Sequence, residues 1–209
     1  LAMAAQTTTI ETVTIVRPLK IISLLCLLIS IILLIICLST NYWLRTKSFH
    51  TGLFRECSDG SLSAIMSPIP GAPPAGTCHG INRDASYITA VAVLMLIGLL
   101  ATVIAFIGNV LGLKSNDLHR KHVFYKTATY LSLFTVLLEL IALIIFPVCF
   151  FVRMNNYGYR TWEFDWSYGV AWGAMLFTFG ASLLLICDKE HEEVYYKEKT
   201  IYNPPTEFA

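Results

Sequence analysis

Four long apolar segments constrain the fold of this chain more than any other feature of its sequence. They cover residues 19–40, 87–113, 123–151 and 167–187. Because a helix rises about 1.5 Å per residue, about 20 apolar residues cross the core of a bilayer, and each segment is long enough. The 209-residue chain is 56% hydrophobic and 14% charged, with a mean hydropathy of +0.63, which is too apolar for a soluble domain. The sequence predicts an all-α membrane bundle with four transmembrane helices.

Four crossings place both termini on the same side of the membrane. Lys and Arg are more numerous on that side than in the two other loops, which is a weak positive-inside bias. Cys57 and Cys78 share the long first loop, where an oxidising exterior would join them in a disulfide. We therefore expect both termini in the cytoplasm. The expected cytoplasmic parts are 1–18, 114–122 and 188–209, and the expected extracellular loops are 41–84 and 152–166.

The loops differ in the structure that their composition allows. Tyr42–Cys57 carries aromatic and aliphatic residues suited to short strands, whereas the Pro/Gly stretch 67–76 cannot join the interior of a sheet. The second outer loop is rich in Tyr and Trp, which settle at membrane interfaces. From Asp188 onward the tail is charged and ends near a Pro pair, so we expect it to be disordered.

Small and polar residues recur along each span at steps of three and four. Lipid supplies no hydrophobic drive for helices to associate, so close packing depends on such residues, and a mean step of 3.5 predicts a left-handed bundle. We expect these residues to face the bundle interior, with Gly108, Gly112, Gly169 and Gly173 as close-packing positions. The predicted stripes are Ser23, Cys26, Ser30 and Cys37; Gly98, Ala101, Ala105, Gly108 and Gly112; Ala128, Ser132, Thr135, Glu139 and Ala142; and Gly169, Gly173 and Gly180.

Glu139 is the costliest residue in the predicted spans. An acid in the middle of a membrane is penalised by a few kcal/mol, so it must be neutral or have a partner. One interpretation makes Glu139 a proton or ion site. The other makes it a packing residue, protonated or hydrogen-bonded to Asn109 or to a serine of the first helix. We favour packing because no second ionisable residue lies nearby in the spans.

The sequence contains no pattern typical of an enzyme, a metal site or a nucleic-acid interface. The net charge is +1, no Lys/Arg run alternates with aromatic residues, and no Gly-rich phosphate loop or nucleophile elbow occurs. The histidines are scattered rather than grouped at metal-ligand spacing. Neither a cofactor nor nucleic acid is expected. Cys187, at the end of the fourth span beside Asp188 and Lys189, is a candidate for palmitoylation; a free thiol is the alternative.

A family resemblance rests on two stretches. The first loop carries, in order, Trp43, Gly52, Leu53, Phe54, Cys57 and Cys78. This order resembles the claudin signature of a Trp, a Gly-Leu-Trp and two bonded cysteines, although Phe54 replaces the usual Trp and the segment between the cysteines is longer. Residues 164–173, FDWSYGVAWG, are similar to the opening of the fourth helix in the branch that contains PERP and the brain cell membrane protein. The chain thus resembles the claudin-like tetraspan superfamily of peripheral myelin, epithelial membrane and claudin proteins.

The resemblance implies a fold and a function. It implies a four-helix bundle topped by a small extracellular antiparallel β-sheet, with one strand from the second loop. It also implies a plasma-membrane protein of cell-cell junctions that associates with itself and with junction proteins or cytoplasmic scaffolds. Trp43 and Phe54 would then serve either in adhesion or as interface anchors. The alternatives are an auxiliary subunit of an ion channel and a paracellular pore former, and the nearly balanced charges of the first loop argue against the pore.

Overall fold

A computed structural model describes most of the chain. The described residues are 8–12, 18–46, 49–58, 74, 76–81, 86–115, 117–156, 162–187 and 196–200. The Pro/Gly-rich residues 67–73 and most of the tail lie outside them, as do the loop charges Lys47, Asp59, Arg83 and Asp84.

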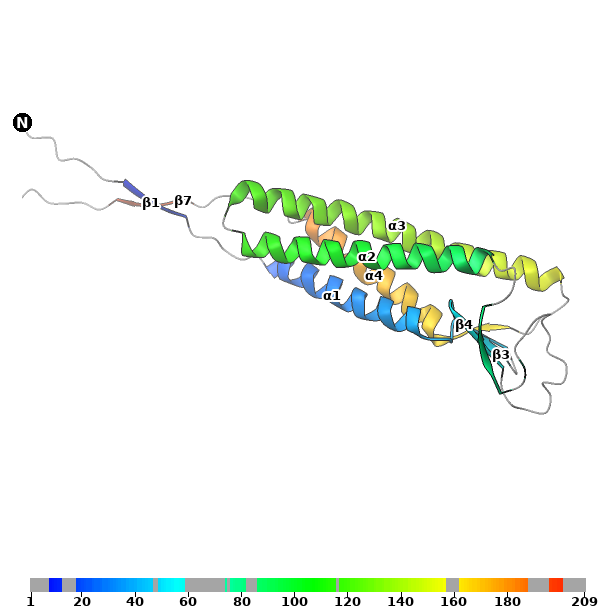
Figure 1. Cartoon of the computed structure of the whole chain (residues 1–209). Coiled ribbons are helices and arrows are strands. Elements are labelled where there is room, and N and C mark those ends of the chain that lie inside the picture. The colour runs from blue at the N-terminus through cyan, green and yellow to red at the C-terminus, as the bar shows by residue number, and fades with distance from the viewer. Residues whose placement is uncertain are drawn as a thin grey trace, which may run out of the picture.

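Four helices form an elongated bundle with a small sheet at one end (Figure 1). They are α1 (Pro18–Ser39), α2 (Ser86–Lys114), α3 (Leu118–Asn156) and α4 (Trp166–Cys187), and all four are long and apolar enough to cross a membrane. Pro18 begins α1 at a position where its missing N–H is not needed. Asp165 precedes α4, and its Oδ1 accepts a hydrogen bond of 2.7 Å from the amide of Trp166. α3 extends beyond the predicted span 123–151 at both ends.

The helices pack through small and polar side chains. α1 packs mainly on α4 and α2 mainly on α3, while the two pairs meet less extensively. Ser30 of α1 shares a hydrogen bond of 2.6 Å with Thr178 of α4, and Asn109 of α2 donates to Ser23 of α1 at 2.9 Å. The stripe predicted on α3, from Ala128 to Ala142, is buried throughout. Many large apolar side chains of all four helices point outward, as expected of helices that face lipid.

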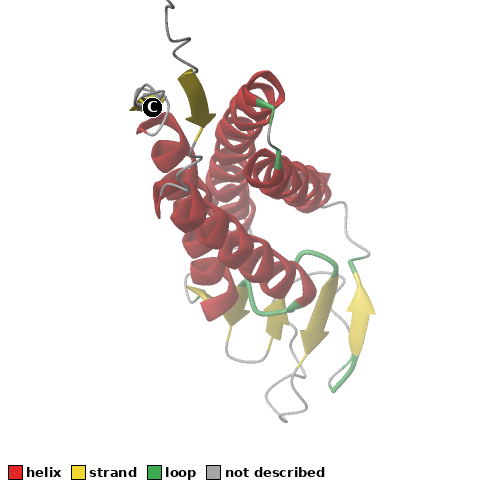
Figure 2. Cartoon of the chain, turned by 90° about the vertical axis from the view of Figure 1, so that its left-hand side faces the viewer, coloured by secondary structure: helices red, strands yellow, loops and turns green. Residues whose placement is uncertain are grey.

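A five-stranded antiparallel sheet lies across one end of the bundle (Figure 2), which we call the sheet end. Its strands are β2 (Leu44–Thr46), β3 (Phe49–Thr51), β4 (Arg55–Ser58), β5 (Cys78–Gly80) and β6 (Glu163–Phe164), in the order β5-β4-β3-β2-β6. Four strands come from the first loop. β6 comes from the second loop and pairs with β2, so that Leu44 lies opposite Phe164. The sheet therefore joins the two loops that were expected outside the membrane.

Both termini lie at the other end of the bundle, which we call the terminus end (Figure 1). There β1 (Thr8–Thr12) and β7 (Tyr196–Thr200) form an antiparallel pair. The prediction of a disordered tail is therefore wrong for residues 196–200. Composition alone could not reveal this pairing, because the main-chain partner is the N-terminal segment, far away in the sequence.

Candidate functional site

Trp43 connects the sheet to the bundle. Its side chain is completely buried, and its indole N–H donates a hydrogen bond of 2.7 Å to the carbonyl of Cys37 in the last turn of α1. The last four carbonyls of a helix have no partner within the helix, so this bond caps α1. The main chain of Trp43 also bonds to Thr51 and to Asp165. A completely buried Trp43 fits neither adhesion nor interface anchoring. It is instead a packing and capping residue.

The Gly52-Leu53-Phe54 motif divides into a buried and an exposed part. A Cβ on Gly52 would lie 2.5 Å from the Thr40 carbonyl oxygen, so only glycine fits against the end of α1. Leu53 is buried in the core, whereas 46% of Phe54 is exposed. Phe54 is therefore the one residue of this motif that another molecule could contact.

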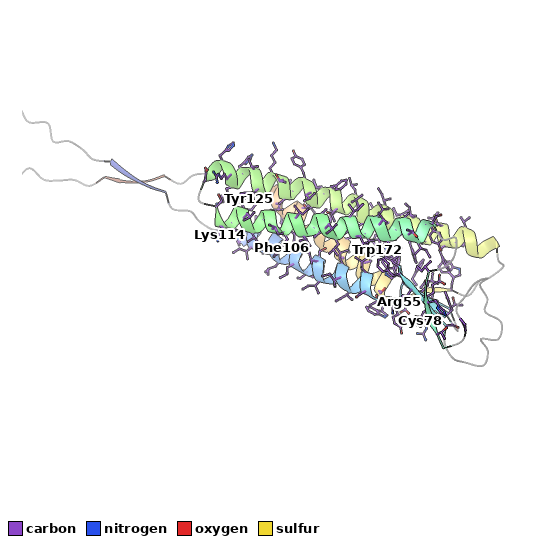
Figure 3. The ribbon with its side chains drawn as sticks, in the orientation of Figure 1. Arg55, Cys78, Phe106, Lys114, Tyr125 and Trp172 are labelled. Carbon is purple, nitrogen blue, oxygen red and sulfur yellow. A yellow bond between two sulfur atoms is a disulfide. The ribbon has the colours of Figure 1, made fainter. Side chains whose placement is uncertain are left out.

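Cys57 and Cys78 lie directly opposite each other on β4 and β5 and form a disulfide. Figure 3 places Cys78 at the sheet end beside Arg55. The bond joins β4 to the segment that returns from the first loop to α2. It therefore ties an edge strand of exposed residues to the rest of the sheet.

Aromatic rings fill the space between the sheet, α3 and α4. Trp43 contacts Phe146 of α3 and Tyr168 of α4, with ring centroids 5.1 and 5.8 Å apart. Tyr168 in turn stacks on Phe164 of β6 at 4.6 Å. The complete aromatic cluster consists of Trp43, Phe146, Phe150, Phe151, Trp162, Phe164, Tyr168 and Trp172. Such ring pairs add to the energy of area burial, so the cluster holds the second loop in place.

Tyr168 also donates the hydrogen bond that one backbone carbonyl of α3 lacks. Pro147 lies inside α3 and has no N–H, so the carbonyl four residues earlier, on Leu143, lacks its usual helical donor. The Tyr168 hydroxyl donates to that carbonyl at 2.9 Å. We did not predict this contact from the sequence, although Pro147 signalled an open carbonyl on Leu143.

The sheet end presents several exposed aromatic side chains. Tyr42 is 40% exposed, Phe54 46% and Trp166 51%. Tyr42 stacks on His50 with centroids 4.5 Å apart and lies 6.3 Å from Trp166. We call Tyr42, His50, Phe54 and Trp166 the outer aromatic residues. His50 lies in β3, Tyr42 and Phe54 lie next to strands of the sheet, and Trp166 begins α4, so these side chains form a candidate contact surface at the sheet end.

Glu139 lies inside the bundle but not beside the partners predicted for it. It is completely buried, and neither carboxylate oxygen has a hydrogen-bond partner among the described residues. Its neighbours include Gly98 of α2, where an added Cβ would lie 3.5 Å from the Glu139 Cγ. Asn109 bonds to Ser23 instead. The hydrogen-bonded alternative is therefore not observed, and Glu139 lies inside the bundle as expected of a packing residue.

The predicted glycines of α2 pack against α3. A Cβ on Gly108 would lie 3.7 Å from Ala128 Cβ, and a Cβ on Gly112 would lie only 2.9 Å from the Tyr125 ring. The aromatic ring of Tyr125 therefore occupies the space that a side chain on Gly112 would need.

The predicted packing role of the α4 glycines is wrong for Gly169 and Gly180, whereas Gly173 faces α1 without a close contact. A Cβ on Gly169 or Gly180 would meet nothing within 4 Å, and one on Gly173 would meet only Leu33 of α1, at 3.8 Å. The buried small residues of α4 are instead Ser167, Ala171, Ala174, Thr178, Ala181 and Ser182. The glycines recur at steps of four and seven and most of the buried residues at steps of three and four, so periodicity could not select the inner face. The hydrogen bonds between the Ser30 hydroxyl and α4, at the Ala174 carbonyl and the Thr178 hydroxyl, select it.

Two further expectations concern the cysteines and metal binding. Cys187 is exposed at the end of α4, and its palmitoylation stays a prediction. Within the described ranges, no three His, Cys, Asp or Glu side chains lie close enough together to hold a metal ion.

A bundle of four membrane-length helices that carries a disulfide-tied sheet at one end defines a multi-pass membrane protein of the tetraspan class. Residues 19–185 match the PMP-22/EMP/MP20/Claudin family, and the chain belongs to this family. It is 34% identical to "p53 apoptosis effector related to PMP-22" of Danio rerio over 137 residues, which are 60% of this chain and 69% of that protein. It is 28% identical to "Claudin domain-containing protein 2" of Homo sapiens over 151 residues, 72% of this chain and 75% of that protein.

Proposed function

We propose that this chain is a non-enzymatic plasma-membrane protein of cell-cell junctions, with the sheet end outside the cell and both termini in the cytoplasm. The observation that carries the proposal is the group of outer aromatic residues in and beside the disulfide-tied sheet at the sheet end. Exposed rings on a fixed framework lose little conformational entropy when they contact a partner. The outer aromatic residues would contact proteins of the adjoining cell or of the same membrane, and the tail would bind cytoplasmic scaffolds.

Lateral self-association is the second part of the proposal. Gly169 and Gly180 of α4 meet no neighbouring helix, and Gly169 is exposed. Glycine on a lipid-facing helix lets another backbone approach closely, which favours contact between neighbouring molecules. Gly169→Leu should thus leave folding intact and weaken clustering.

Expression in cultured epithelial cells tests both parts. Full-length wild-type protein should reach the surface and concentrate at cell borders. Phe54→Ser should reach the surface but strengthen adhesion less than wild type in a cell-dissociation assay, whereas Leu53→Ser, at a buried neighbour, should be retained inside the cell. Gly169→Leu should reach the surface and cluster less, while Val93→Leu on exposed α2 should behave as wild type. Uniform surface distribution of the wild type, without enrichment at borders, would reject the junctional role.

The name of one relative supports a second candidate function. That protein is called a p53 apoptosis effector, and this chain is 34% identical to it. In this alternative the chain promotes cell death from the membrane. Measuring viability in the same cells, with and without p53, separates the two: death that depends on expression, with no change in adhesion, favours the alternative.

A further inference from the structure

Glu139 of α3 places a carboxyl group inside the bundle without a partner. None of its side chain is exposed, and neither carboxyl oxygen has a hydrogen-bond partner in the described part of the chain. α2 approaches this group at Gly98, where an added Cβ would lie 3.5 Å from the Glu139 Cγ and 3.8 Å from its Oε1. The carboxyl group therefore faces α2 at a position that carries no side chain.

The buried hydroxyl groups around this position donate elsewhere. The Thr135 side chain lies beside Glu139 near Gly98, and its hydroxyl donates to the Leu131 carbonyl at 3.0 Å. The Thr102 hydroxyl, one helical turn from Gly98, donates to the Gly98 carbonyl at 2.9 Å. Both donors are used within their own helices, so neither binds the carboxyl group of Glu139.

The charged residues of the four helices lie far from Glu139. The sequence of α4 contains no Lys, Arg, His, Asp or Glu. Lys20 and Lys114, the charged residues of α1 and α2, lie at the terminus end. On α3 the nearest basic residues in the sequence are Lys126 and Arg153, each more than three helical turns away, or about 20 Å along the axis. The helices therefore supply no positive charge beside Glu139.

Two titratable groups of other helices face this part of the bundle. The Cys37 thiol of α1 interacts electrostatically with Glu139, and its Sγ donates to the Leu34 carbonyl at 3.2 Å. The Tyr168 hydroxyl of α4 donates to the Leu143 carbonyl, one turn after Glu139 on α3. A thiol and a phenol that keep their hydrogens in these bonds are neutral, so they cannot offset the charge of a carboxylate.

We propose that Glu139 is a proton-binding site: its carboxyl group is held neutral, and α2 and α3 keep their close contact while the proton is bound. A buried carboxylate loses its hydration, and without a cation or a donor nothing offsets that loss, whereas the neutral acid avoids it. Once the proton leaves, water has to enter beside Gly98 to solvate the charge. That water would separate α2 from α3, which make the most extensive contact between helices.

The sign of the pH dependence follows from this arrangement. The folded bundle binds the proton more tightly than the unfolded chain does, because only the folded bundle keeps the carboxyl group away from water. The stabilisation is therefore present at acidic and neutral pH and is lost as alkaline pH removes the proton.

Infrared spectroscopy of the purified full-length protein in phosphatidylcholine nanodiscs tests the protonation state directly. A neutral carboxylic acid absorbs at a higher C=O frequency than a carboxylate or an amide, so wild type should show such a band at neutral pH and lose it at alkaline pH. Isotope-labelled glutamate should shift the band. Glu139→Gln should lack it, whereas Glu163→Gln, which removes an exposed acid of β6, should keep it. In Glu139→Asp the band should respond to labelled aspartate instead, which keeps the assignment readable where the Gln variant fails to fold.

Thermal unfolding tests the link between the proton and the packing. Between neutral pH and about pH 10, the unfolding temperature of wild type should fall by about 5 °C more than that of Glu139→Gln, which has the same shape and no proton to lose. Cys37 and Tyr168 are present in both proteins, so their titration cancels in the comparison.

Two results would overturn the proposal. The first is a wild-type spectrum at neutral pH without a carboxylic-acid band, or with a band that neither Glu139→Gln nor Glu139→Asp alters. The second is an equal fall of the unfolding temperature in wild type and Glu139→Gln, which would show that the proton is not linked to the contact between α2 and α3. Both measurements use purified protein, so they do not depend on the junctional proposal.

Discussion

At the scale of single residues, Trp43 and Tyr168 have the same structural role. Each donates a side-chain hydrogen bond to a backbone carbonyl that its helix leaves unsatisfied. In the membrane interior no water is present to donate a hydrogen bond to such a carbonyl, so an unsatisfied carbonyl costs folding free energy. Aromatic residues near a membrane interface are usually interpreted as anchors. Here two of them complete the hydrogen bonding of helices, a role that sequence position alone does not reveal.

Replacing Trp43 with Phe should destabilise the protein by about 1–3 kcal/mol, because an aromatic ring is kept while the Cys37 carbonyl loses its 2.7 Å donor and retains only the longer bond of 3.3 Å from the Thr40 hydroxyl. The measurement is thermal unfolding of the purified protein in detergent. Trp166→Phe is the control, since Trp166 is half exposed and no hydrogen bond from its indole is described. Equal loss of stability in the two variants would show that the ring, and not the cap, matters at Trp43.

Tyr168→Phe should cost a similar amount, about 1–3 kcal/mol, because it removes the donor to Leu143. The double variant with Pro147→Ala provides the decisive comparison. Alanine at 147 restores a backbone N–H to Leu143, so the loss of the hydroxyl should then matter much less. Thermal unfolding of all four proteins gives the coupling energy. A coupling energy of zero would contradict the assigned role of Tyr168.

At the scale of helices, some small residues lie at contacts between helices and others lie on the outer face of the bundle. On α2 and α3 they face each other across a close contact, whereas on α4 alanines and hydroxyl residues face inward and Gly169 and Gly180 meet no neighbour. Gly112→Ala should therefore destabilise the bundle by about 1–3 kcal/mol, because the new methyl overlaps the Tyr125 ring. Gly169→Ala should be neutral or slightly stabilising, since it meets no neighbour and alanine favours helix.

Unfolding temperature and surface delivery check this contrast between the two glycines. Both variants add the same single methyl group, so each serves as the control for the other. A loss of stability at Gly169 equal to that at Gly112 would mean that the inner face of α4 has been assigned wrongly.

At the scale of the whole molecule, the disulfide stabilises the sheet and requires that the sheet end faces the oxidising exterior of the cell. Closing a loop of 21 residues is worth roughly 3 kcal/mol in the chain-entropy model. Cys57→Ser should therefore cause retention inside the cell rather than merely weaker adhesion. Alkylation under native conditions checks the bond: wild-type Cys57 and Cys78 should resist labelling until a reductant is added. Labelling of both without reductant, together with normal surface delivery of Cys57→Ser, would contradict the expected oxidising exterior.

The sequence by itself determined the four spans, the class of protein and the candidate cysteine pair. These features follow from apolar length, composition and cysteine position, which are local properties of the chain. The buried stripe of α3, including Glu139, was also predictable, because its five members share a single face. Tertiary structure decided the rest: which face of α4 packs, which partner Asn109 takes, and where the rings of Trp43, Tyr125 and Tyr168 lie. Two stripes on one helix have the same period, and only a hydrogen bond from another helix, here Ser30 to Thr178, distinguishes them.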